Sequence, residues 1–213
     1  MNKYWAPNKF VIEQIEDYCK INNFEKILEI GPGEKPFSLA NHYVDNVERE
    51  NSFILDIDTD KFDLPDQHFD FTYCRHVFED IQNPDFAFKE LKRVSKQGYI
   101  ETPSPLVECI RGVDYTGNGR GYIHHRYIIW NDDNKIHFLP KFPIIELLEF
   151  DDDALLKLAE EPLNWNNYIL WNQDTEFIIY KNGLNLDISN GYNDILNIAI
   201  SSSLENTKKL FLK

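Results

Sequence analysis

The stretch Ile27-Leu28-Glu29-Ile30-Gly31-Pro32-Gly33 decides the fold that this sequence predicts. It is an apolar run that carries one acid, followed directly by two glycines one residue apart. A buried strand that ends in a Gly-x-Gly turn brings bare backbone close to a ligand, because a Cβ at those positions would block the approach. The stretch therefore indicates a parallel strand that ends at a nucleotide-type pocket, although the same pattern also closes ordinary strands.

Strands and helices alternate on both sides of this stretch. Asn83 as a cap and Pro84 at the first position predict a helix, which Gly98 would end. Alternation of this kind is typical of a parallel sheet. The other expected elements, from apolar spacing and short apolar runs, are a helix over residues 8–21 and strands over residues 27–30, 52–55, 69–74 and 99–102.

The second half of the sequence has a different organisation. Residues 111–126 contain four glycines and are too long and irregular for a simple connection, and such loops are usually functional or disordered. Residues 167–171 and 176–181 flank a four-residue polar segment, which predicts an antiparallel hairpin. Residues 192–213 have the apolar spacing of a closing helix.

Composition and charge exclude several classes of protein. A net charge of -14 repels a polyanion at long range, and no basic stripe offsets it, so we expect no nucleic-acid partner. No apolar run approaches the roughly 20 residues that span a membrane, and residues 1–7 lack the apolar core of a signal peptide. Three scattered cysteines form neither a disulfide framework nor a zinc site. We therefore expect a single domain over residues 1–213 in a cytoplasmic setting.

Four short motifs follow one another in a defined order. They are Leu28-Glu29-Ile30-Gly31-Pro32-Gly33, Leu64-Pro65-Asp66-Gln67-His68-Phe69-Asp70, His76-Val77-Phe78-Glu79-Asp80 and Glu90-Leu91-Lys92-Arg93-Val94. Together they resemble class I S-adenosylmethionine-dependent methyltransferases, in particular the methyltransferase type 11-like group. The resemblance covers about residues 24–105.

The resemblance implies an α/β fold: a Rossmann-like, seven-stranded, mostly parallel sheet with helices on both faces and one antiparallel strand. It also implies S-adenosylmethionine as the cofactor. The cofactor half would occupy about residues 1–105. The acceptor loop and the C-terminal hairpin and helix would occupy about residues 106–213.

Carried over residue by residue, the resemblance also implies a cofactor site. The methionine part would be held by Glu29 and by the backbone of Gly31, Pro32 and Gly33, and Asp45 would accept hydrogen bonds from both ribose hydroxyls. Acids at strand ends and in turns are also common without any ligand, so a purely structural role for Glu29 and Asp45 stays open as the alternative. The remaining members of the implied site are Asp56 and Ile57 beside the adenine, and Cys74, Arg75 and His76 after the fourth strand.

Two features of the first turn separate the alternatives. Pro36 interrupts the connection that leads to Asp45, so the helix that usually follows the first strand should be a turn or two at most. Pro36 also stands where a nicotinamide-dependent oxidoreductase needs the third small residue of Gly-x-Gly-x-x-Gly. The oxidoreductase is therefore disfavoured, and a non-catalytic cofactor-binding or scaffold protein stays as an alternative.

Transfer to a hydroxyl needs a base within hydrogen-bond reach, and histidine is the most natural one. His124 and His125 in the long loop are the first candidates, and His76 is another. A divalent metal held by Asp114 and the paired histidines is the less favoured alternative, because their spacing matches no recognised ligand pattern, and no metal ligand is assigned. The candidate acceptor-binding residues are Arg111, Tyr122 and Arg126.

These observations favour O-methylation of a sugar, a glycan or another small molecule. N-methylation of a small molecule is the alternative reaction, because a neutral amine needs no base. The identity of the acceptor and the oligomeric state are not written in the sequence.

Overall fold

The structure is a computed structural model of the 213-residue chain, and it describes residues 8–45, 48, 50–114, 118–180 and 188–212. Contacts divide the chain into two compact units. The first consists of Met1–Glu101 and Leu170–Thr175, and the second of Thr102–Ile169 and Glu176–Lys213. The boundary at Glu101 lies close to the expected end of the cofactor half.

The first unit is built on a parallel sheet. Its strands have the order β3-β2-β1-β4-β5, and every neighbouring pair among them is parallel. β8 (Asn166–Asn172) follows β5 as the sixth and antiparallel strand, so the sheet has six strands in the described residues where seven are expected. The five parallel strands are β1 (Ile27–Ile30), β2 (His42–Val44), β3 (Ser52–Phe53), β4 (Phe71–Arg75) and β5 (Gln97–Pro103).

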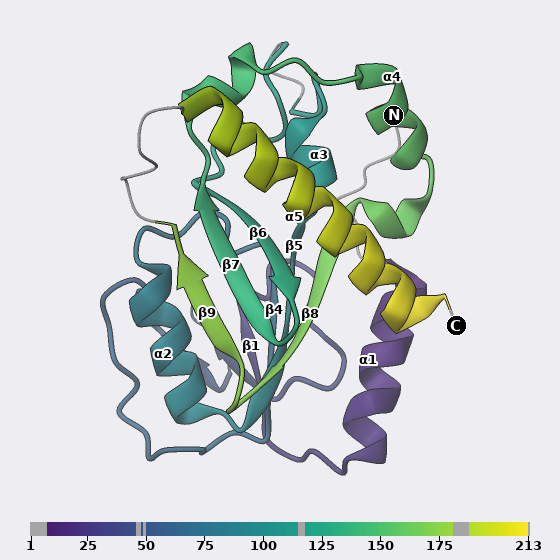
Figure 1. Ribbon diagram of the computed structural model, residues 1–213. Coiled ribbons are helices and arrows are strands. Elements are labelled where there is room, and N and C mark those ends of the chain that lie inside the picture. Colours follow the sequence, from purple (N-terminus) through teal and green to yellow (C-terminus); the bar gives the residue numbers. More distant parts are fainter. Residues whose placement is uncertain (1–7, 46–47, 49, 115–117, 181–187, 213) are drawn as a thin grey trace. The chain divides into compact units, whose positions relative to one another are not determined.

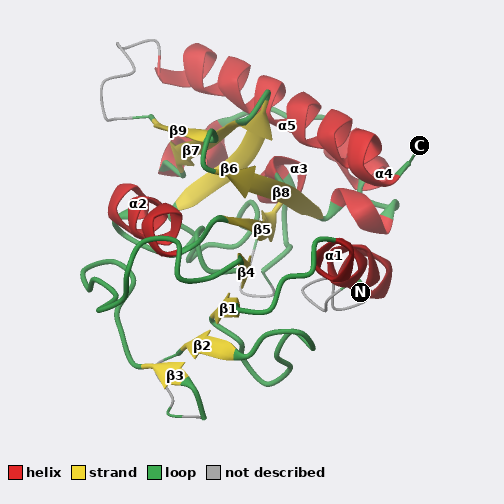
Figure 2. Ribbon diagram, turned by 90° about the horizontal axis from the view of Figure 1, so that it is seen from below, coloured by secondary structure: helices red, strands yellow, loops and turns green. Residues whose placement is uncertain are grey.

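Helices α1 (Lys9–Ile21) and α2 (Pro84–Val94) cover opposite faces of this sheet (Figure 2). Asn8 begins α1, because its side chain accepts hydrogen bonds from the backbone N–H groups of Phe10 and Val11. The apolar stripe of α1 is buried, and the Tyr18 hydroxyl donates to Gln97 Oε1 over 2.7 Å. The expected opening helix is therefore confirmed.

Gly98 does not end α2, so that expectation was wrong. Asn83 and Pro84 begin the helix as expected, but it ends at Val94 and Gly98 lies inside β5. A Cβ on Gly98 would stand 2.5 Å from the Thr72 carbonyl oxygen and 2.7 Å from the ring of Trp171. The glycine is needed for close packing between strands, and not for a helix end.

No helix follows β1. Residues 31–41, all of them described, form turns and extended backbone, which agrees with the expected loss of a full helix at Pro36. The segment is held against the sheet by Phe37, whose ring stacks on Tyr73 with centroids 4.1 Å apart. Its backbone N–H donates to Glu29 Oε2 over 2.8 Å.

The second unit contains a three-stranded sheet with the order β6-β7-β9. β6 (Tyr127–Asp132) and β7 (Lys135–Pro140) form an antiparallel hairpin. Its two turn residues, Asp133 and Asn134, both have positive φ, as the tight turns that suit hairpins require. Helix α5 (Ile188–Phe211) crosses this sheet (Figure 1) and confirms the expected closing helix.

Four short helical segments complete the described part of the second unit. Each begins at a proline or after a side chain that caps it. They are α3 (Pro105–Cys109), η1 (Pro143–Leu147), α4 (Asp152–Leu158) and η2 (Pro162–Asn164).

The expected hairpin over residues 167–181 was wrong in its pairing. Both of its strands exist, as β8 and β9 (Glu176–Ile179), but β9 pairs in parallel with β7. The turn between them is closed by side chains: the N–H of Asn172 donates to Thr175 Oγ1, and the N–H of Asp174 donates to Asn172 Oδ1. These contacts end β8, and the chain then passes from the six-stranded sheet to the three-stranded sheet that contains β9.

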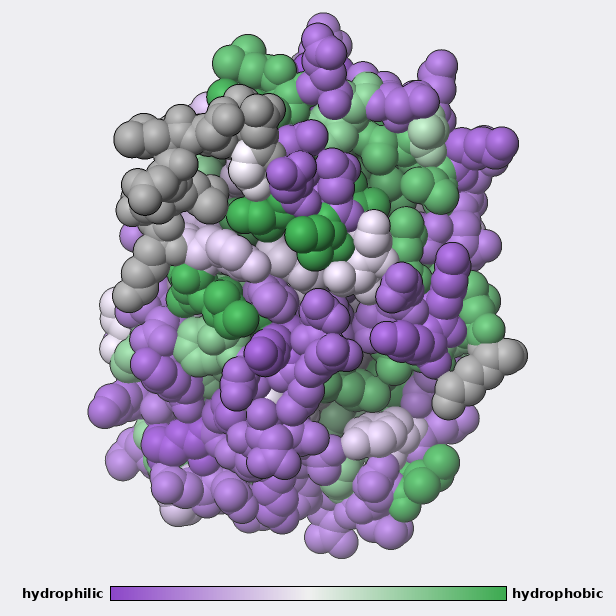
Figure 3. Space-filling model, viewed as in Figure 1, coloured by the Kyte–Doolittle hydropathy of each residue, from purple (hydrophilic) through white to green (hydrophobic). Residues whose placement is uncertain are grey.

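One face of the molecule carries a large hydrophilic area. Hydrophilic side chains cover most of the lower half of the face in Figure 3, over α2 and the loops beside it. No helix in the described part of the chain is both long and apolar enough to cross a membrane.

Candidate functional site

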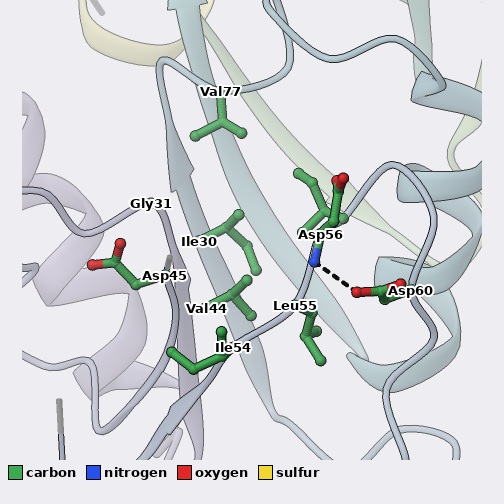
Figure 4. Close-up of a pocket in the computed structure, with 10 residues that line it drawn as sticks. Ile30, Gly31, Val44, Asp45, Ile54, Leu55, Asp56, Asp60 and Val77 are labelled. Carbon is green, nitrogen blue, oxygen red and sulfur yellow. Dashed lines mark hydrogen bonds between the residues drawn. The ribbon is translucent and has the colours of Figure 1, made fainter. Parts of the chain in front are cut away.

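The first unit has a pocket of about 600 Å³ at the carboxyl ends of β1, β2 and β3 (Figure 4). Open parallel sheets bind ligands at this edge, beside the point where the strand order reverses. Its lining combines apolar side chains with three carboxylates. The lining residues are Ile30, Gly31, Val44, Asp45, Ile54, Leu55, Asp56, Ile57, Asp60 and Val77.

Gly31 gives the pocket its bare backbone. Its φ is +66°, and a Cβ there would stand 2.8 Å from Cγ2 of Val77. Gly33 also has a positive φ, of +56°, but a Cβ on it would meet nothing within 4 Å in the described structure. The first glycine is therefore required by both conformation and space, and the second by conformation alone.

The three carboxylates make the pocket acidic. Asp45 directly follows β2, and Asp60 accepts a hydrogen bond from the backbone N–H of Asp56 over 2.9 Å. The carboxylate of Asp56 accepts in turn from the N–H of Asp58. Among the described residues, no lysine or arginine belongs to the lining. Such a pocket accepts hydrogen bonds from hydroxyls and amines and disfavours phosphates.

The implied cofactor residues thus divide into two groups. Gly31, Asp45, Asp56 and Ile57 line one pocket. The other implied residues lie outside this lining. Pro32 and Gly33 continue the turn after Gly31, and Glu29 is buried in β1, where it accepts from the backbone of Phe37. Cys74 and Arg75 are the last residues of β4, and His76 follows them.

Arg75, at the end of β4, is paired with a buried acid. Its Nη2 lies 3.0 Å from Oε1 of Glu101, its neighbour on β5, and the Tyr99 hydroxyl donates to Oε2 of the same carboxylate. Burial lowers the pKa of Arg75, but the charge and hydrogen bond of Glu101 outweigh that effect and raise it above its ordinary value. Arg75 is therefore a permanent cation that holds Glu101 in place.

His76 lies beside this pair, between two buried carboxylates. Its Nδ1 is 3.2 Å from Glu79 Oε1, and its Nε2 is 3.7 Å from Glu101 Oε1. The backbone N–H of His76 donates to the carbonyl of Glu101 over 2.8 Å. The neighbouring residue, Val77, lines the pocket.

In the second unit, His125 belongs to a buried polar network. Glu108, only 1% exposed, accepts from His125 Nδ1 over 2.7 Å and from Lys141 Nζ over 2.5 Å. Burial raises the pKa of Glu108, but the hydrogen bond from His125 and the charge of Lys141 outweigh it and hold that pKa below its usual range. His125 therefore has an identifiable structural partner.

The long loop is fastened by the same network. Lys141 Nζ also donates to the carbonyls of Arg120 and Tyr122, over 2.8 Å each. A Cβ on Gly121 would overlap Glu108, at 2.3 Å from its Oε2 and 2.6 Å from its Cα. The described part of the loop is thus packed closely against Glu108 and Lys141.

The other candidates of the loop lie nearer the surface. The side chain of His124 is 59% exposed, and its Nδ1 lies 3.8 Å from Asp114 Oδ2. The Tyr122 ring lies 4.7 Å from that of His125. Arg111 donates to the carbonyls of Asn118 and Glu146, and Arg126 is exposed.

The sequence analysis did not include four charged residues whose side chains are buried beside the candidate histidines. They are Glu79, Glu101, Glu108 and Lys141. Glu101 could have been noticed, because it is a carboxylate within an apolar strand. The other three pair with residues that sequence spacing does not connect to them.

Comparison with known proteins identifies the class of the pocket-forming segment. Residues 18–100 match the family described as methyltransferase domain. The match lies over the motifs that resemble class I methyltransferases, and it confirms that resemblance. No curated protein matches the chain.

Several solved structures are similar to parts of the chain. The plantazolicin methyltransferase BpumL, in complex with a triazolic desmethylPZN analog and SAH, is 17% identical with a TM-score of 0.38, and the match covers 49% of each chain. The YcgJ protein from Bacillus subtilis is 13% identical with a TM-score of 0.40, over 55% of this chain and 64% of that one. An S-adenosylmethionine-dependent methyltransferase from Mesorhizobium loti is 13% identical with a TM-score of 0.40, over 68% and 89%. The chain thus spans about half the length of BpumL.

Proposed function

We propose that this protein is an S-adenosylmethionine-dependent methyltransferase that acts on an oxygen of a sugar, a glycan or another small molecule. The observation that carries the proposal is the acidic pocket with Gly31 at its edge, inside a segment that matches the methyltransferase-domain family. Three free, buried thiols agree with a reducing, cytoplasmic setting.

The residues of the pocket fit this cofactor. Asp45 can accept hydrogen bonds from two ribose hydroxyls, and the apolar side chains of Ile54 and Ile57 can pack against adenine. Gly31 lets its turn pack directly against Val77 at the edge of the pocket, where a Cβ would displace that side chain. When bound, S-adenosylmethionine supplies an activated methyl group.

A nicotinamide dinucleotide fits the same residues poorly. Its pyrophosphate usually lies at a helix N-terminus, where backbone N–H groups and the helix dipole favour negative charge. Residues 31–41 form no helix, and the described lining holds three acids and no cation. Both features favour a cofactor without phosphates.

The chain must also take a proton from a hydroxyl acceptor. We assign this task to one of three histidines, His124, His125 and His76. His76 directly precedes the pocket residue Val77, and the side chain of His124 is 59% exposed. Nδ1 of His125 is engaged by Glu108 and Nδ1 of His76 by Glu79, so in both of these rings the other nitrogen would have to take the proton. Replacing the true base by alanine should lower turnover about 100-fold or more, with cofactor affinity near normal.

Calorimetry tests the cofactor. We expect S-adenosylmethionine and S-adenosylhomocysteine to bind and the nicotinamide dinucleotides to give no heat. Binding of a dinucleotide without binding of either sulfur compound would overturn the proposal.

A screen with labelled S-adenosylmethionine tests the acceptor. Its arms are nucleotide sugars, oligosaccharides, small phenols, small amines and RNA. Transfer to a sugar or phenol hydroxyl, nearly independent of salt, is the expected result. Transfer to RNA that falls steeply with salt would contradict the proposed acceptor class, since phosphate contacts make binding salt-dependent. Transfer to amines alone would establish N-methylation instead.

A further inference from the structure

Half of the residues that line the pocket come from one segment, residues 54–60, which we call the wall segment. It follows β3 and consists of turns and irregular backbone. The pairing of β3 with β2 ends at Phe53, so the sheet does not fix the residues beyond it. No residue of the segment is buried, although all of them are described, so packing holds it only weakly. The position of the wall segment therefore depends on hydrogen bonds that the sheet does not supply.

Two carboxylates give the wall segment its internal shape. The backbone N–H of Asp56 donates to Asp60 Oδ2 over 2.9 Å (Figure 4), and the N–H of Asp58 donates to Asp56 Oδ1 over 2.9 Å. The N–H of Asp60 donates in turn to the carbonyl of Asp56 over 2.7 Å. Short acidic side chains often bond to nearby backbone in this way. Each of these bonds joins two residues of the segment, so they shape it without attaching it to the rest of the unit.

Asp58 attaches the wall segment to the start of α2. Its Oδ1 accepts from the backbone N–H of Gln82 over 2.9 Å and from that of Asn83 over 2.7 Å, and its Oδ2 lies 3.0 Å from the Gln82 nitrogen. The Asn83 side-chain amide donates back to the Asp58 carbonyl over 3.4 Å. Asn83 caps α2, so the Asp58 carboxylate lies at the positive end of the helix dipole, which stabilises a negative charge. Asp58 is not itself one of the lining residues.

We propose that Asp58 is a positioning residue of the pocket: by binding the two backbone N–H groups before α2, it holds Asp56 and Ile57 where they meet the ligand. This inference rests on the proposed function, in which these two residues lie beside the adenine of S-adenosylmethionine. Asp58 acts through the wall segment and does not touch the ligand. Its removal should therefore weaken binding at the adenosine end and leave the turn at Gly31 unchanged.

Calorimetry with two ligands tests the inference. S-adenosylhomocysteine spans the whole proposed site, and 5′-methylthioadenosine carries only its adenosine end. Asp58→Ala should weaken both by the same factor, at least about tenfold, because a charged acceptor of backbone N–H groups is lost. Asp58→Asn keeps one neutral acceptor oxygen, so it should bind more tightly than Asp58→Ala but more weakly than the native protein. A residue that only supports the fold would lower the unfolding temperature and leave the affinity of the folded protein unchanged.

Asp85→Ala is the matched control. Asp85 lies in the first turn of α2 and pairs with Lys89 over 2.8 Å, so its loss removes the same charge from the same end of the helix. It should bind both compounds as the native protein does. Native affinity in either Asp58 variant, an equal loss in Asp85→Ala, or a loss for S-adenosylhomocysteine alone overturns the inference and leaves the proposed function standing. If Asp58→Ala does not fold, Asp58→Asn decides by the same measurement. If the native protein binds neither compound, the proposed function fails and the inference falls with it.

Discussion

Gly31 and Val77 face each other so closely that a Cβ on the glycine would stand 2.8 Å from Cγ2 of the valine. Both residues line the pocket, and they come from the turns that follow the neighbouring strands β1 and β4. The space between them is therefore set by the distance between two backbone turns, and a single methyl group would fill it.

Gly31→Ala should weaken S-adenosylmethionine binding more than Gly33→Ala. Both positions have positive φ, so both variants carry a similar backbone cost, but only the methyl group added at position 31 would displace Val77. Calorimetry should show at least a tenfold loss of affinity, about 1.4 kcal/mol, for Gly31→Ala relative to Gly33→Ala. Equal affinities of the two variants would mean that the packing of Gly31 against Val77 does not shape the binding site.

Asp45→Ala should weaken the same binding by about 1.5–3 kcal/mol, the range for hydrogen bonds to a charged group. Asp45 lines the pocket, whereas Asp85 lies on the outer face of α2 and pairs with Lys89. Asp85→Ala is therefore the control and should bind normally. An equal loss in both variants, measured by calorimetry, would point to net charge as the cause instead of a local contact.

Glu108→Ala should destabilise the second unit by about 3–5 kcal/mol, because it leaves the charge of Lys141 buried without its carboxylate. The control is Glu176→Ala. The side chain of Glu176 is 71% exposed and lies 3.9 Å from Lys135, a surface pair worth less than about 1 kcal/mol. Urea unfolding, followed by circular dichroism, measures both. A small effect at Glu108 would mean that the loop is not fastened through this residue.

Asp70→Asn should flatten the loss of stability in acid. Burial raises the pKa of Asp70, but hydrogen bonds from the Lys96 side chain and from the N–H groups of Lys26 and Glu25 lower it from 3.8 to about 2. Because the folded-state pKa lies below the unfolded one, the stabilisation is complete above about pH 4 and is lost as the pH falls toward about 2. Thermal unfolding from pH 7 to pH 2 measures this. If the unfolding temperatures of the variant and the native protein fall in parallel as the pH is lowered, Asp70 does not contribute to the acid sensitivity.

The cofactor side of the fold was predictable because its signals are local. The strand before Gly31, the apolar spacing of α1, the Asn83 cap and the interruption at Pro36 all act on residues a few positions away. Asp45 was placed by the family resemblance and not by a local signal, and it directly follows β2.

The features that were predicted wrongly or missed depend mostly on contacts between residues far apart in the chain, which the spacing of residues in the sequence does not reveal. Gly98 is explained by Trp171, far along the chain, and β9 pairs with β7 because the chain leaves its sheet after Thr175. The hairpin around Asp133 and Asn134 carried a usable turn signal that the sequence reasoning missed. The roles of His124, His125 and His76 stay predictions.

The pocket draws every one of its lining residues from the interval between Ile30 and Val77. The candidate loop of the second unit begins only at Arg111, after a fully separate run of sequence. A genetic crossover between these two intervals would exchange the loop and leave the identity of every lining residue unchanged. The pocket and the proposed acceptor loop can therefore change through separate genetic events.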